Sequence, residues 1–193
     1  MKRLILSFIF LFLMIKSNAQ NKQLPYYEIP EASNEYTAGS VMSRMVDGLG
    51  FRYYWATEGL TEKDLQFRPN AEVRTTEETI DHILNLSQVV VNATLNVESG
   101  TFDFSKMPFA DKRKKTLENL KAASDILKKS DDISQFKIVF KRGESTSEFP
   151  FWNAINGPIA DAIWHAGQIA SFRRSSGNPF PKGVSVFTGK VKR

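Results

Sequence analysis

The chain contains two histidines, His82 and His165, and each lies near other polar side chains at helical spacing. Asp161, His165 and Gln168 follow one another in steps of four and three residues, so a single helix face would carry all three. Glu78 precedes His82 by four residues, which places these two side chains one above the other. Imidazole and carboxylate groups are ligands of divalent metal ions. The two rows therefore predict a metal site if their helices meet.

Ordinary packing is the alternative. A D-x-x-x-H pair on a helix often forms an ion pair, or holds a histidine that is satisfied by hydrogen bonds. Glu78 and Asp81 lie near a helix start, where carboxylates usually serve the positive end of the helix dipole. Leaving polar groups buried without partners costs about 1–3 kcal/mol each. This cost favours a fold in which the two rows of polar side chains face each other. Ligation by His82, Asp161 and His165 would leave at least one coordination position open, as in catalytic sites.

Composition excludes several other classes of site. The chain has no cysteine, so it has no disulfide, no thiol nucleophile and no thiolate ligand for a metal. The formal net charge is +5, and it falls to +2 if the N-terminal segment with Lys2, Arg3 and Lys16 is removed. Such a small charge argues against nucleic-acid binding. We expect the basic clusters at 112–115 and 128–129 to form a solvated helix face.

The first 19 residues have the layout of a secretory signal peptide. Lys2 and Arg3 precede an apolar run at 4–15, and small residues follow at 17–19. The run is shorter than the roughly 20 residues that a membrane-spanning helix needs, although an uncleaved anchor is the alternative. We expect cleavage after Ala19 and an exported protein, periplasmic or secreted, without a stable membrane anchor.

The remaining chain reads as one helical domain at 36–193, preceded by an extended lead-in at 20–35. The first helix is expected at 37–58, with Val41, Met45, Leu49 and Tyr53 forming its apolar stripe and with Met42, Val46 and Trp55 widening it. A long loop is expected at 59–74. A third long helix is expected at about 109–129, after the second one.

Two helices would carry the candidate ligands. Thr75 and Glu78 form a capping-box pattern that starts a helix ending near 99–100. The last helix is expected from about 150–152 to 176, with a bend at Gly157-Pro158. Gly177 would end it. Residues 132–151 alternate and predict a short hairpin or an extended excursion before this helix.

Three segments, in this order, resemble the DinB-like (YfiT-like) metalloenzyme superfamily. They are Arg68-Pro69-Asn70, the stretch T-T-E-E-T-I-D-H-I-L at 75–84, and D-A-I-W-H-A-G-Q-I at 161–169. The resemblance covers about residues 36–174 and is most specific in H-A-G-Q-I followed by F-R-R at 172–174. It implies an all-α, four-helix-bundle fold with a nickel or zinc site held by three histidines.

One position departs from the family pattern. His82 matches the first ligand and His165 the last, whereas Asp161 occupies the place of the middle histidine. Aspartate also binds zinc, manganese or iron, which gives a two-histidine, one-carboxylate set. It could instead hold a ligated water or pair with His165. Gln168 and Glu78 would not bind the metal themselves but would form hydrogen bonds that orient the histidine rings or a water.

The resemblance implies a metal-dependent hydrolase or transferase that acts on a small molecule. Export makes a thiol cosubstrate less suitable, because the cytoplasmic thiol pool is absent there, and this favours hydrolysis. Two alternatives stay open. The domain could bind a metal or ligand without catalysis, or the site could be degenerate and the protein act through its surface, for example as a homodimer.

Overall fold

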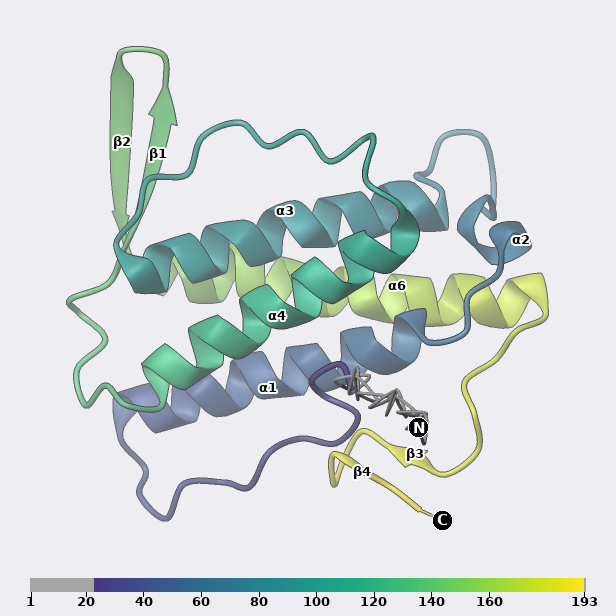
Figure 1. Ribbon diagram of the computed structural model, residues 1–193, viewed down its shortest axis with the longest axis horizontal. Coiled ribbons are helices and arrows are strands. Elements are labelled where there is room, and N and C mark those ends of the chain that lie inside the picture. Colours follow the sequence, from purple (N-terminus) through teal and green to yellow (C-terminus); the bar gives the residue numbers. More distant parts are fainter. Residues whose placement is uncertain (1–22, 193) are drawn as a thin grey trace, which may run out of the picture.

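The computed structural model describes residues 23–192 (Figure 1). The predicted signal peptide at 1–19 and the first residues of the lead-in lie outside this range. The described chain is mostly helical, and four long helices contain most of its helical residues. The elements are α1 (Ala38–Thr57), α2 (Glu62–Leu65), α3 (Thr76–Leu95), α4 (Phe109–Leu127), β1 (Lys137–Arg142), β2 (Ser145–Pro150), α5 (Trp152–Ala154), a π-helical turn η1 (Ile155–Ile159), α6 (Ala160–Ser176), β3 (Val184–Ser185) and β4 (Lys190–Val191).

Side-chain pairs fix how the long helices run relative to one another. The hydroxyl of Ser43, near the start of α1, lies 2.9 Å from that of Ser124, near the end of α4. The Nε of Arg113, near the start of α4, donates to the hydroxyl of Thr57 at the end of α1. These two helices are therefore antiparallel.

Helices α3 and α4 run in the same direction. The ammonium group of Lys112 meets Glu77 near both helix starts, and the amide of Asn119 meets Gln88 further along both helices. Parallel neighbours need a connection that returns to the starting end. The segment at 96–108 provides it by running back past α3 (Figure 1).

The buried stripe of α1 differs in part from the expected one. Leu49 and Tyr53 are fully buried, but Val41 is 51% exposed and Met45 is 37% exposed. On a helix of 3.6 residues per turn, residues four apart differ in direction by about 40°. Side chains in a long row of four-residue steps therefore turn gradually away from the core. Met42, Val46 and Trp55, which were expected to widen the stripe, are buried.

The start of α3 is confirmed and its end is corrected. The hydroxyl of Thr75 accepts from the backbone N–H of Glu78, and the Glu78 carboxylate accepts from the N–H of Thr75. The helix ends at Leu95 rather than near residue 99, because Asn96 adopts the left-handed conformation with φ 54°. Asparagine tolerates this conformation better than most residues.

The segment before the last helix folds as a hairpin, as one of the two expectations had it. β1 and β2 pair antiparallel from Lys137 opposite Pro150 to Arg142 opposite Ser145. A second small antiparallel pair joins β3 to β4 near the C-terminus. The structure is thus mostly helical with two small strand pairs, rather than strictly all-α.

The lead-in is held against α1 by one inserted ring. Tyr26 has a left-handed φ of 75° and is buried, and a Cβ at position 50 would lie 2.4 Å from its ring. Gly50 therefore makes room for Tyr26, which explains a residue that otherwise weakens the middle of a helix. Ile29 donates its backbone N–H to the carbonyl of Gly189, so the lead-in also joins the two ends of the chain.

The expected loop at 59–74 contains the short helix α2, which docks on the end of α6. The buried Asp64 carboxylate accepts hydrogen bonds from the hydroxyl of Ser176, the side-chain amide of Asn178 and the backbone N–H of Thr61. Burial alone would raise the pKa of Asp64, but these hydrogen bonds outweigh it and hold that pKa well below its usual range. α2 and α6 are thus joined through an ionised carboxylate.

Candidate metal centre

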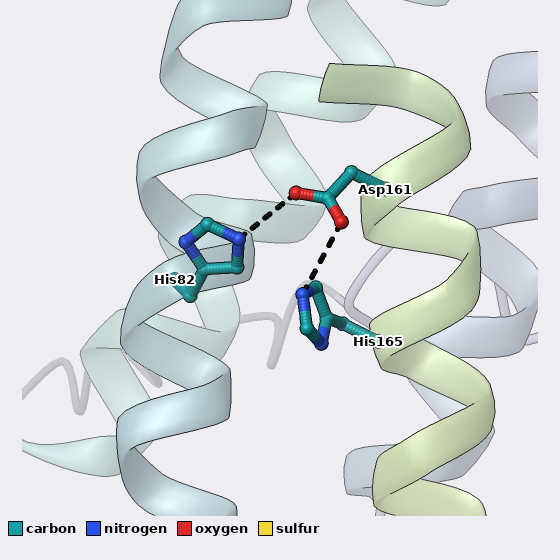
Figure 2. Close-up of side chains that lie close together, drawn as sticks. All are labelled: His82, Asp161 and His165. Atoms are coloured by element: carbon teal, nitrogen blue, oxygen red, sulfur yellow. Dashed lines mark hydrogen bonds and ion pairs between the residues drawn. The ribbon is translucent and has the colours of Figure 1, made fainter. Parts of the chain in front are cut away.

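Asp161 lies between the two histidine rings, with one carboxylate oxygen directed at each (Figure 2). Its Oδ2 is 3.0 Å from Nε2 of His82, and its Oδ1 is 3.2 Å from Nε2 of His165. The ring centroids are 4.7 Å apart and the ring planes are nearly perpendicular. The structure thus brings together the three residues that the sequence predicted as ligands, although His82 precedes Asp161 by 79 residues in the chain.

These separations suit ligation of one ion. Ligand bonds of about 2.0–2.1 Å place two donors about 2.9 Å apart at a right angle and about 3.3 Å apart at the tetrahedral angle. Each N···O distance falls in this range, but the two distances run to different oxygens of Asp161; one donor atom from each residue lies within 4.8 Å of the others. The three residues therefore form a cluster that could hold a metal ion with modest side-chain adjustment.

The start of α3 determines where His82 points. Thr75 caps the helix, and His82 follows in the second turn, on the side of α3 that faces α6 (Figure 2). The preceding residue, Asp81, points elsewhere, because its carboxylate pairs at 2.7 Å with Lys112 on α4. Consecutive helical residues are about 100° apart, so the two side chains serve different helix contacts.

A π-helical turn precedes the other two ligands. η1 carries Pro158, which lacks a backbone N–H, and Gly157 has the non-helical ψ of −105°. The bend expected at Gly157-Pro158 is therefore present. Asp161 and His165 follow one turn apart on α6, so both reach toward His82 (Figure 2). π-turns inside helices are frequent at functional sites.

Gln168 contacts one ring nitrogen of His165. Its Oε1 lies 2.8 Å from Nδ1, and with the amide in this orientation the oxygen accepts a hydrogen bond from Nδ1–H. In a neutral ring the other nitrogen, Nε2, then presents a lone pair. That lone pair faces Oδ1 of Asp161, which is also an acceptor. Two acceptors 3.2 Å apart need a positive charge between them, supplied by a proton or a metal ion.

Of the two roles that the sequence left open for Glu78, its contacts favour the one at the start of its helix. Its carboxylate lies in the capping box and accepts from the N–H of Thr75 at 2.7 Å. Among the described residues, no hydrogen bond joins Glu78 to His82. This interaction with Thr75 lowers the pKa of the exposed Glu78 carboxyl. A role for Glu78 in orienting His82 or a water stays a prediction.

Solvent reaches the centre. The exposed fractions of the side chains are 27% for His82, 36% for Asp161 and 17% for His165. Metal ligands at a catalytic centre have to be accessible on at least one side, because substrate or water completes the coordination. The partial exposure of these three side chains meets that requirement.

The basic cluster at 112–115 differs from the expected solvated face, because its first two residues are buried. Lys112 is 2% exposed and pairs with Asp81 and Glu77. Burial alone would lower the pKa of Lys112, but these two carboxylates outweigh it and raise that pKa. Arg113 is 9% exposed. Four consecutive helical residues span all sides of a helix, so they cannot share one solvated face.

Sequence reasoning missed the anchor of α6. Arg173 is buried, and its Nη1 donates to the carbonyl of Trp55 at 2.7 Å, at the end of α1. Its Nε donates to the carbonyl of Asn178. Burial lowers the pKa of Arg173, and nearby carboxylates oppose this effect. The F-R-R triplet at 172–174 was noticed as part of a motif, but nothing in its spacing says which arginine is buried.

Comparisons of the chain with protein families, with characterised proteins and with solved structures found no match. The resemblance to the DinB-like superfamily therefore stays a prediction from the motifs. Within residues 23–192, none of the helices has both the length and the apolar character of a membrane span.

Proposed function

We propose that His82, Asp161 and His165 bind one divalent metal ion and that the centre hydrolyses a small molecule or transfers a group to it, outside the cytoplasm. We further propose that the four long helices form a DinB-like four-helix bundle around this centre. Zinc or nickel suits the site best, and manganese or iron would also accept two imidazoles and a carboxylate.

One observation carries this proposal. The Nε2 atom of His165 and the Oδ1 atom of Asp161 face each other at 3.2 Å, while the amide oxygen of Gln168 accepts a hydrogen bond from Nδ1–H. The facing atoms of a neutral ring and a carboxylate are both acceptors. A cation between them would turn this opposition into two ligand bonds, and His82 would supply a third from α3.

Each residue then has a defined part. His82 and His165 supply neutral nitrogen donors, and Asp161 supplies an anionic oxygen that lowers the net charge of the site. Gln168 holds the ring of His165 in the tautomer that leaves Nε2 free to bind. A bound divalent ion supplies Lewis acidity, which polarises a carbonyl or phosphoryl oxygen or lowers the pKa of a bound water.

Activity on simple substrates tests the enzymatic part of the proposal. The metal-loaded protein is assayed against small esters, amides and lactones, together with the variants His165→Ala and His82→Ala. We expect turnover of at least one class and its loss in both variants, with circular dichroism showing an intact helical fold. Turnover that survives both substitutions would reject the assignment of this centre as the active site.

A non-catalytic role is the second candidate, and one observation favours it. Asp161 already contacts both rings, so a protonated histidine would satisfy the cluster as a cross-helix ion pair. Stoichiometric metal without turnover would indicate a binding module. Neither metal nor turnover would indicate a degenerate site that serves packing.

A further inference from the structure

Trp164 is exposed beside the proposed centre. It is 78% exposed, although it lies on α6 between residues that are buried or half-buried. It precedes His165 by one residue and follows Asp161 by three. A bulky aromatic residue with most of its surface in water contributes little to the core, so its ring is available to contact a ligand.

Helix geometry places this indole next to the ligands. Residues three and four apart are neighbours on a helix surface, with Cβ atoms about 5–6 Å apart. Trp164 is therefore a surface neighbour of Asp161 on one side and of Gln168 on the other. Long side chains on a helix lean toward its N-terminus, which directs the indole over the turn that carries Asp161.

The surface around Trp164 is open. Gly167 follows it by three residues, and a Cβ built there would meet no heavy atom within 4 Å. Ala160, four residues before Trp164, is small and exposed. The indole is thus flanked by two positions with little or no side chain, which leaves room for a flat group to lie against it.

We propose that Trp164 is the aromatic wall of the substrate site, and that the substrates carry a planar apolar group next to the group that meets the metal. This inference rests on the proposed metal centre and adds the substrate class to it. A ring stacked on the indole would hold the reacting group over the exposed side of Asp161. Stacking between aromatic rings adds to the free energy of binding beyond simple area burial.

Two metal-binding probes that differ in one ring measure this contribution. Acetohydroxamate and benzohydroxamate bind a metal through the same two oxygens, but the second also carries a phenyl ring. We expect the zinc-loaded protein to bind benzohydroxamate about five- to tenfold more tightly than acetohydroxamate. This ratio of affinities is the range that aromatic stacking supplies. In Trp164→Ala the ratio should fall to about one to two, and Trp164→Phe should restore most of it.

Trp152 offers a matched control. It is 69% exposed and lies on α5, nine residues before Asp161. Trp152→Ala removes the same type of side chain from α5, outside the proposed site, and should leave the benzohydroxamate ratio unchanged. An equal ratio in the original protein and in Trp164→Ala, or an equal loss in both tryptophan variants, would overturn the inference.

A zinc-free arm separates this inference from the metal proposal. Benzohydroxamate is added to zinc-free protein while the indole N–H resonances of the three tryptophans are followed by NMR. A larger shift at Trp164 than at Trp152 supports the aromatic wall even if zinc does not bind. Equal shifts, or none, would reject it, whatever the metal titration gives.

Discussion

At the scale of single residues, a hydrogen bond from His165 to Gln168 decides how the centre can work. The proton on Nδ1 is fixed by the amide oxygen at 2.8 Å, and Nε2 is left to face Asp161. Without Gln168, the ring could exchange tautomers and turn away. The amide would therefore act on the proposed metal ion through the imidazole rather than by direct contact.

Replacing Gln168 tests this role. We expect Gln168→Leu to weaken zinc binding about tenfold, the usual lower limit for loss of a hydrogen-bonding partner behind a histidine ligand. The unfolding temperature of the metal-free protein should change little. The measurement is competition with a zinc-binding dye, and NMR of the ring nitrogens reports the tautomer of His165. Gln66→Leu, which removes an exposed glutamine on another segment, is the control.

An unchanged zinc affinity in Gln168→Leu, together with an unchanged tautomer, would show that the amide has no positioning role. A loss of affinity with an unchanged tautomer would assign Gln168 a purely structural part.

The residues of the site were largely predictable from the sequence, because two histidines and helical spacing leave few alternatives. His82, Asp161 and His165 meet as expected. The geometry of Asp161 was not predictable, since spacing cannot tell whether a carboxylate bridges two rings or pairs with one. The surroundings of Tyr26 were also missed, because a left-handed backbone at a tyrosine leaves no mark in periodicity.

At the scale of elements, two buried carboxylates at helix contacts have pKa values that are shifted in opposite directions. Asp64 joins α2 to α6 and its pKa is held low by hydrogen bonds that outweigh burial. Asp47 lies on α1, 5% exposed, and the hydroxyl of Ser124 on α4 donates to it. For Asp47, burial raises the pKa, and the hydrogen bond from Ser124 only partly offsets this.

The low pKa of Asp64 predicts a loss of stability in acid. A carboxyl whose pKa is lowered by folding contributes stability above its unfolded pKa, which is about 3.9, and loses it as the pH falls further. Asp64→Asn should therefore reduce the free energy of unfolding by about 2 kcal/mol at pH 7, the scale of hydrogen bonds to a charged group. Urea unfolding should show the deficit shrinking below about pH 4.

Asp131→Asn is a suitable control for Asp64→Asn, because Asp131 is exposed. It should change the free energy of unfolding by no more than about 0.5 kcal/mol, both at pH 7 and at pH 3. A deficit for Asp64→Asn that stays constant from pH 7 to pH 3 would mean that its charge contributes nothing.

The raised pKa of Asp47 predicts a loss of stability as the pH rises, the reverse of the prediction for Asp64. Its contribution is complete below the unfolded pKa of about 3.9 and is lost as the pH rises through the higher folded value. Asp47→Asn keeps the shape and a hydrogen-bonding oxygen, so it should stabilise the protein at pH 7 by about 1 kcal/mol. Urea unfolding at pH 7 and pH 4 measures the gain, which should be smaller at pH 4.

Asp125 provides the comparison for Asp47, since it lies one residue after Ser124 but is half exposed and pairs with Lys121. Asp125→Asn should not stabilise the protein at pH 7. A loss of stability in Asp47→Asn at pH 7 would contradict the account of Asp47.

Element boundaries were predictable where a local hydrogen bond defines them and less so elsewhere. The start of α3 follows from Thr75 and Glu78, whose side chains form the cap that the pattern indicated. Its end was placed too late, because the apolar Val97 follows Asn96 and the Ser99-Gly100 pair resembles a helix end. The burial of Lys112 was missed, because only tertiary contact with Asp81 and Glu77 makes a buried ammonium tolerable.

At the scale of the whole molecule, the centre joins two helices that are distant in sequence. His82 lies on α3 and the other two ligands lie on α6 (Figure 2). The direction of each helix could not be derived from the sequence, because loop length alone did not reveal that α3 and α4 are parallel. A metal ion at this junction would bind the folded chain and stabilise it against unfolding.

Binding should therefore raise the unfolding temperature. An ion at a hundred times its dissociation constant stabilises the folded state by about 2.7 kcal/mol. For a chain of this size that corresponds to about 5–10 °C. Differential scanning calorimetry with zinc and with nickel measures the shift. Both His82→Ala and His165→Ala should abolish it, and a shift that persists in both would place the stabilising ion elsewhere.

The most direct test of the central claim is the number of metal ions bound per chain, measured by elemental analysis after zinc loading and dialysis. The account predicts about one ion per chain for the unaltered protein and almost none for the double variant His82→Ala/His165→Ala, with the helical circular dichroism signal retained. Absence of bound zinc, nickel, manganese and iron from the unaltered protein, or full occupancy in the double variant, would contradict it.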